Sequence, residues 1–123
     1  MTVRGVLIVE SLRIPSRIAG IPLRLHAITR FVAPPEPADG SPTWTFLEFE
    51  ADSAHAEALA AAFAGALDSS LPWYASFKSA DEMFVIFPNK QFRYDLGDAN
   101  GKADAEAYAR SVGVPEAQLD WEQ

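Results

Sequence analysis

The sequence WYASFKSADEMFVIFPNKQFRYDL, residues 73–96, shows the clearest pattern in the chain. It contains three segments rich in aromatic and β-branched residues, a composition typical of strands. The polar breaks between these segments, residues 79–82 and 88–90, have the length of hairpin connections. The stretch therefore predicts three consecutive antiparallel strands, over residues 73–78, 83–87 and 91–96.

Three more strands are expected upstream of this stretch. Residues 4–13 (RGVLIVESLR) are apolar on both sides at their centre, which favours an interior place in a sheet. Residues 23–31 alternate between apolar and basic side chains and predict a half-exposed strand, and residues 43–50 (TWTFLEFE) predict a third. Residues 33–42 contain four prolines, which cannot donate to a sheet ladder, so we expect a mobile surface loop there.

Two segments have the apolar spacing of amphipathic helices. The first, residues 54–67, is rich in alanine and follows Asp52, whose side chain can cap a helix. The second covers residues 102–112, and Gly113 behind it suits a left-handed C-terminal cap.

The expected order of elements is βββα-βββα, which is typical of an α+β fold with an antiparallel sheet. A chain of 123 residues, 49% of them hydrophobic, is expected to form a single domain over residues 1–123. We expect both helices to cover one face of the sheet. The similar layout of the two halves also suggests an internal repeat as a hypothesis.

Composition excludes several classes of protein. The chain has no cysteine, so disulfides, thiolate metal sites and cysteine nucleophiles are excluded. No apolar run approaches the roughly 20 residues of a membrane-spanning helix. Glu10 and Arg13 interrupt the only apolar stretch near the start that could serve as a secretory signal, so we expect a cytoplasmic protein without a membrane partner. A net charge of −7 repels phosphate backbones, so we expect no nucleic-acid partner.

Neither a metal site nor a cofactor is expected. The two histidines, His26 and His55, fall on a strand and at a helix start, and would have to converge with a carboxylate to bind a metal. The glycine-rich turn at residues 97–101 has neither the glycine spacing nor the hydroxyl residue of a phosphate-binding loop.

Two glutamates are the best catalytic candidates. Glu48 and Glu50 share one face of the strand at residues 43–50, beside aromatic residues, and apolar surroundings and like charge raise a carboxyl pKa toward the range useful for acid–base catalysis. His26 is a further weak candidate. The alternative is that these glutamates form ion pairs with Arg24 and Arg30 on the neighbouring strand.

The aromatic residues indicate a ligand site or an interface. With both helices on one face, the core would be too small for ten of them: Trp44, Phe46, Trp73, Tyr74, Phe77, Phe84, Phe87, Phe92, Tyr94 and Trp121. Trp and Tyr are favoured at pockets and interfaces because they combine apolar area with a polar tip, and a homodimer is the commonest interface. Complete burial of the three tryptophans within one chain would argue against this interpretation. The candidate ligand or interface residues are Trp44, Phe46, Trp73, Tyr74, Arg24 and Arg30.

Three short stretches resemble a family of small bacterial conserved hypothetical proteins. They are residues 73–75 (WYA), 92–98 (FRYDLGD) and 115–121 (PEAQLDW). The resemblance implies a bacterial cytoplasmic domain, and it supplies no activity and no site residue.

Two functions from different classes are therefore predicted. The first is a non-catalytic module whose aromatic sheet face binds a small apolar ligand or another chain. The second is a small enzyme that uses Glu48 or Glu50 in an aromatic cleft. The sequence leaves open whether the protein is an enzyme.

Overall fold

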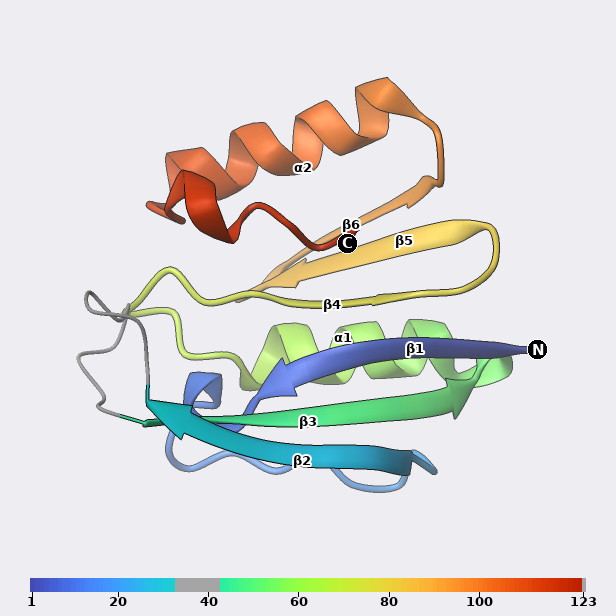
Figure 1. Ribbon diagram of the computed structural model, residues 1–123, viewed down its shortest axis with the longest axis vertical. Coiled ribbons are helices and arrows are strands. Elements are labelled where there is room, and N and C mark those ends of the chain that lie inside the picture. The colour runs from blue at the N-terminus through green and yellow to red at the C-terminus, as the bar shows by residue number, and fades with distance from the viewer. Residues whose placement is uncertain (33–42, 123) are drawn as a thin grey trace.

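The computed structural model describes residues 1–32 and 43–122, and it has an α+β fold with a six-stranded antiparallel sheet (Figure 1). This confirms the predicted fold class. The predicted loop at residues 33–42 lies outside the described residues. The strands are β1 (Thr2–Ile8), β2 (Arg24–Val32), β3 (Thr43–Asp52), β4 (Ala75–Lys78), β5 (Glu82–Phe87) and β6 (Lys90–Asp95), in the sheet order β2-β3-β1-β4-β5-β6.

The order of strands confirms the meander and contradicts the repeat. β4, β5 and β6 are consecutive neighbours, and β1 lies in the interior between β3 and β4, both as predicted. The first three strands lie in the order β2-β3-β1, whereas the last three lie in the order β4-β5-β6. The two halves therefore have different layouts, and the internal-repeat hypothesis is wrong. β2 is an edge strand and is more exposed than predicted, since only Ala27 is partly covered.

Helix α1 (Ala56–Ala66) follows a short 3₁₀ helix, Ser53–His55. The Asp52 side chain accepts a hydrogen bond from the amide of Ala54 at 2.9 Å, so the predicted cap is present. The buried side of α1 packs Phe63 edge-to-face on Phe49, with ring centroids 5.6 Å apart. Small alanines on the same side allow the helix to lie close to the sheet.

Helix α2 (Ala99–Ser111) begins three residues earlier than predicted. The cause is Asp98, whose carboxylate accepts hydrogen bonds from the amides of Asn100 and Gly101, each at 3.1 Å. These bonds satisfy amides that have no partner within the helix. Gly113 follows the helix with φ of 94°, the left-handed conformation that its position predicted.

The two helices pack on opposite faces of the sheet, so the prediction that both cover one face was wrong. Phe84 and Ile86 are buried in the core that includes α1, whereas Met83, Val85 and Phe87 are buried in a second core with α2. These five side chains are at most 3% exposed. A strand that is apolar on both sides needs cover on both sides, and one helix supplies each cover.

The second core is much narrower than the sheet. Alongside α2, it contains side chains of β5, β6 and the C-terminal segment, which we define as residues 112–122. Val6 lies opposite Ser76, and Ser76 lies opposite Val85, so all three point to the face that α2 covers. On that face, the chain described here places no helix over β1, β2 and β3, and we call this area the open face. Figure 1 shows α1 behind β1 and β4, and α2 beside β5 and β6.

Candidate functional site

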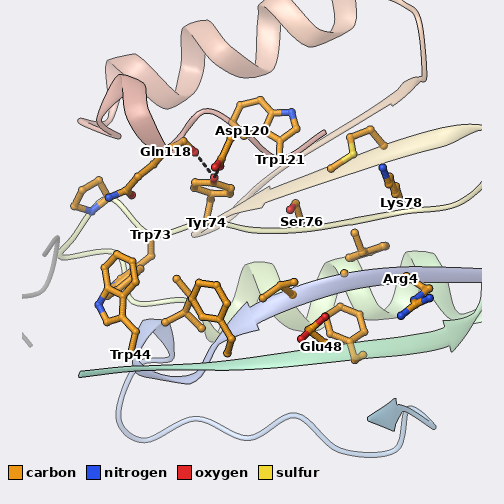
Figure 2. Close-up of a pocket in the computed structure, with 18 residues that line it drawn as sticks. Arg4, Trp44, Glu48, Trp73, Tyr74, Ser76, Lys78, Gln118, Asp120 and Trp121 are labelled. Carbon is orange, nitrogen blue, oxygen red and sulfur yellow. Dashed lines mark hydrogen bonds between the residues drawn. The ribbon is translucent and has the colours of Figure 1, made fainter. Parts of the chain in front are cut away.

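A pocket of about 480 Å³ lies between the open face and the C-terminal segment (Figure 2). Its floor comes from alternate residues of β3, β1 and β4, which point to one side of the sheet. Its opposite wall comes from Gln118, Asp120 and Trp121. The pocket is therefore built by segments that are far apart in the sequence.

One end of the pocket is aromatic. Trp44 and Trp73 pack against each other with ring centroids 5.7 Å apart, and Phe46 and Tyr74 line the space beside them. The two indole N–H groups are buried and have no hydrogen-bond acceptor among the described residues. Because both indoles are almost fully buried, the accessible apolar surface at this end comes mainly from the half-buried Phe46 and Tyr74, and the Asp120 carboxylate lies 3.4 Å from the Tyr74 hydroxyl.

Hydrogen bonds hold the C-terminal wall in place. The Tyr74 hydroxyl donates to the backbone carbonyl of Gln118. Burial raises the pKa of Tyr74 above its ordinary value, so the hydroxyl keeps the proton that it donates. A second anchor is Tyr94 on β6. The Trp121 indole donates to the Tyr94 hydroxyl at 3.0 Å, and that hydroxyl donates to Glu122 at 2.5 Å. The wall is thus tied to Tyr74, the residue directly before β4, and to Tyr94 on β6.

The other end of the pocket is charged. Arg4 on β1 and Lys78 on β4 lie directly opposite each other, and both line the pocket. Glu48 also lines it, half-buried, from β3. None of these three side chains has a hydrogen bond or an ion pair with another described residue. Figure 2 shows Arg4 and Lys78 at one end, Trp44 and Trp73 at the other, and Glu48 between the ends.

Glu50 lies outside the pocket and is already paired. Its Oε1 accepts a hydrogen bond from His26 Nε2 at 2.7 Å and lies 3.4 Å from a guanidinium nitrogen of Arg24. A bulge in β2 between Leu25 and Ala27 accompanies this arrangement. The hydrogen bond from His26, followed by a hydrogen bond with the Thr2 side chain and a smaller contribution from the Arg24 charge, holds the pKa of Glu50 below its ordinary value of 4.5. A carboxyl group with a lowered pKa is a poor general acid at neutral pH.

The predicted site residues fall into two groups. Five line the pocket: Trp44, Phe46, Glu48, Trp73 and Tyr74. The other four do not, since Glu50, His26 and Arg24 form the paired cluster, and Arg30 donates to the Thr45 hydroxyl at 3.2 Å. The binding and catalytic roles of all nine stay predictions.

Sequence reasoning missed Arg4, Ser76 and Lys78. A signal for two of them was present, because Tyr74, Ser76 and Lys78 alternate along one strand and must share a face. The pairing of β1 with β4 could not be inferred, and without it Arg4 had no neighbour. The residues of the C-terminal wall were missed for the same reason.

The argument from surplus aromatic residues was wrong. Trp44, Trp73 and Trp121 are only 5%, 3% and 7% exposed, and the other seven aromatic residues of the set are buried or half-buried. They fit because helices on both faces create two cores where one was expected. The case for a ligand therefore depends on the pocket that these side chains line and not on exposed aromatic surface.

Among known proteins, no family model and no solved structure matches the chain. In residues 1–32 and 43–122, no group of three or more His, Cys, Asp or Glu side chains could hold a metal ion. Over the same residues, no helix is both long and apolar enough to span a membrane.

Proposed function

We propose that this protein is a non-catalytic module of the bacterial cytoplasm that binds one small, largely apolar molecule between the open face and the C-terminal segment. The pocket carries the proposal. Its volume of about 480 Å³ and its mainly aromatic and aliphatic lining match small-molecule sites, which usually measure roughly 300–1,000 Å³. The proposed location is supported by Glu10 and Arg13, which interrupt the apolar stretch near the start, and by the resemblance of three short stretches to a bacterial family.

The floor of the pocket offers apolar area that a ligand would remove from water. Val6 is 37% exposed although it sits in the middle of an interior strand, and Ile8 and Phe46 are partly exposed beside it. Covering apolar surface contributes about 25 cal/mol per Å². A planar apolar molecule that covers these side chains would therefore bind through the hydrophobic effect.

The test uses N-phenyl-1-naphthylamine, a neutral apolar probe whose fluorescence rises in an apolar site. We expect saturable binding of one probe per chain. Val6→Trp would fill the pocket and lower the affinity by about 10-fold or more, equivalent to ~1.4 kcal/mol. Val9→Trp is the matched control, because Val9 is also 37% exposed but does not line the pocket. Unsaturable binding, or equal effects of the two variants, would contradict the proposal.

A specific observation also supports a homodimer. Edge strand β2 exposes Leu25, Ile28 and Val32, which are 52%, 61% and 81% exposed. An edge strand with exposed apolar side chains can pair with the same strand of a second copy. Light scattering of the purified protein should then give twice the chain mass of 13.4 kDa, and Ile28→Lys should give the single chain mass. A monomeric wild-type protein would contradict this proposal.

The alternative function is a small enzyme that uses Glu48. It is favoured by one observation: Glu48 is half-buried in the pocket and has no partner among the described residues. Compounds that bind the pocket can be incubated with the wild-type protein and with Glu48→Gln, and then analysed by mass spectrometry. Conversion by the wild type alone would establish the enzyme, and recovery of every compound unchanged would favour the binding module.

A further inference from the structure

We infer that the molecule bound in this pocket is an amphipathic anion, with one anionic group between Arg4 and Lys78 and an apolar ring toward Trp73 and Tyr74. This inference depends on the proposed function and names the chemistry of its ligand. The relevant feature is the distribution of charge along the pocket.

The basic pair is placed by the register of two strands. Arg4 on β1 is the direct cross-strand partner of Lys78 on β4, and both side chains line the pocket. Directly opposite side chains have Cβ atoms about 5 Å apart, and like charges at that distance destabilise a sheet. An anion bound between the two side chains would replace this repulsion with two attractions.

No carboxylate of the described residues neutralises the pair. The other cross-strand neighbour of Arg4 is Glu50, whose carboxylate is bonded to His26 and Arg24. Arg4 and Lys78 have no ion pair of their own among the described residues. Two unpaired cations side by side in a chain of net charge −7 are a local positive site in an acidic protein.

The neighbouring residues restrict the ligand to one negative charge. Glu48 lies between the two ends of the pocket, and Asp120 lines it from the C-terminal segment, 3.4 Å from the Tyr74 hydroxyl (Figure 2). A second negative charge on the ligand would meet these carboxylates and be repelled. A hydroxyl or amino group at the same place could instead donate to Glu48. The pocket therefore favours a monoanion with a donor group near its middle.

The apolar part of the ligand has only one direction available. Val6 and Ile8 follow Arg4 on the same side of β1, and Ile8 lies opposite Phe46, so the apolar floor runs from the basic pair to the aromatic end. Aromatic or branched aliphatic carboxylic acids have this arrangement, with a compact anionic group attached to an apolar body. Multiply charged phosphates and neutral lipids do not.

Two fluorescent probes separate the charge from the apolar body. 1-Anilinonaphthalene-8-sulfonate carries a sulfonate, and N-phenyl-1-naphthylamine has the same ring system without it. We expect Arg4→Gln and Lys78→Gln each to lower the affinity for the sulfonate probe by about 5- to 10-fold, because each removes a charged hydrogen bond to the sulfonate. The affinity for the neutral probe should change by less than about 2-fold. Arg17→Gln is the matched control, because Arg17 is exposed, lies outside the pocket and carries the same charge.

The outcomes distinguish this inference from the proposed function. If Arg4→Gln and Lys78→Gln weaken both probes equally, or if Arg17→Gln weakens the sulfonate probe as much, the anion site is wrong while the apolar pocket stands. If the wild-type protein does not bind the neutral probe, the proposed function is wrong, and the inference that depends on it is wrong as well. Selective loss of the sulfonate probe in the two pocket variants supports the inference.

Discussion

Phe84 and Val85 are adjacent on β5 but are buried in two different cores, Phe84 with α1 and Val85 with α2. Phe84 stacks on Phe77 with ring centroids 4.7 Å apart, whereas Val85 belongs to the core that the C-terminal segment closes. Because α2 is on the second face, it cannot help to cover the first. Because it packs at the β5–β6 end, it leaves β1, β2 and β3 without cover on its own side, and the pocket lies there.

Substitutions at two helical glycines should have opposite effects on stability. A Cβ atom at Gly101 of α2 would lie 2.4 Å from the Cβ of Tyr94 on β6, whereas a Cβ at Gly65 of α1 would meet nothing within 4 Å. Gly101→Ala should therefore lower the free energy of unfolding by about 1–3 kcal/mol. Gly65→Ala should raise it by about 0.5–1 kcal/mol, because alanine is the better helix former.

Urea unfolding of the two glycine variants measures both changes. If Gly101→Ala proved as stable as the wild type, α2 would not lie this close to β6. The Gly65→Ala variant serves as the control for a general effect of alanine in a helix.

Removing the Tyr94 hydroxyl should loosen the C-terminal segment. In Tyr94→Phe, the buried indole N–H of Trp121 loses its acceptor and Glu122 loses its donor, so the free energy of unfolding should fall by about 1–3 kcal/mol. Tyr108→Phe is the control, since the Tyr108 hydroxyl has no hydrogen bond among the described residues, and it should stay within about 0.5 kcal/mol of the wild type. Equal unfolding curves for the two variants would contradict the packing of this segment.

The Tyr74 hydroxyl should matter for binding as well as for stability. It donates to the Gln118 carbonyl and so fixes the wall of the pocket. We expect Tyr74→Phe to lower the affinity for the neutral naphthylamine probe by about 3-fold, less than 1 kcal/mol. The effect is small because the variant frees the wall to move but leaves the floor of the pocket intact. Titration of Tyr74→Phe and Tyr108→Phe side by side measures the effect. An unchanged affinity would show that the C-terminal segment does not contribute to the site.

Stability should fall in acid partly through Glu50. Its pKa in the folded protein is below the ordinary 4.5, chiefly because His26 donates a hydrogen bond to the carboxylate. A carboxyl group with a lowered folded-state pKa stabilises the fold above pH 4.5, and this contribution is lost as the pH falls through the folded-state value. Melting temperatures of the wild type should therefore fall more steeply below pH 4.5 than those of Glu50→Gln.

The His26→Leu variant tests the cause of that pKa. Without the principal hydrogen bond, the acid dependence should lie between those of the wild type and Glu50→Gln. A dependence identical to the wild type would mean that His26 does not hold the carboxylate in solution.

Local patterns predicted most of the elements. The aromatic and β-branched segments of residues 73–96 became β4, β5 and β6, and Asp52 and Gly113 cap helices as their positions indicated. Such signals depend on a few neighbouring residues, so they can be recognised without the rest of the chain. The start of α2 was misplaced because Asp98 was taken as part of a turn, although its side chain caps the helix.

The candidate site was only partly predictable. Trp44, Phe46 and Glu48 alternate along one strand, so their common face could be inferred. The neighbouring strand with Arg24 and Arg30 was also predicted, and β2 does pair with β3. The bulge between Leu25 and Ala27 was not predicted, and it places Arg24 opposite Glu50 but Arg30 opposite Thr45, whose hydroxyl the Arg30 guanidinium bonds. The strand on the other side, β1 with its partner β4, could not be inferred, because strand pairing between distant segments leaves no local pattern.

The amino-acid sequence by itself determined an α+β chain without cysteine, the approximate positions of its strands and helices, and the faces of most alternating side chains. Only the tertiary structure decided that the helices lie on opposite faces, that Arg4 meets Lys78, and that the C-terminal segment closes a pocket against the open face. The physical reason is that periodicity is local, whereas burial is shared between segments. The run from Met83 to Phe87 showed that β5 needs cover on both sides, but only packing of the whole chain decided which segments supply it.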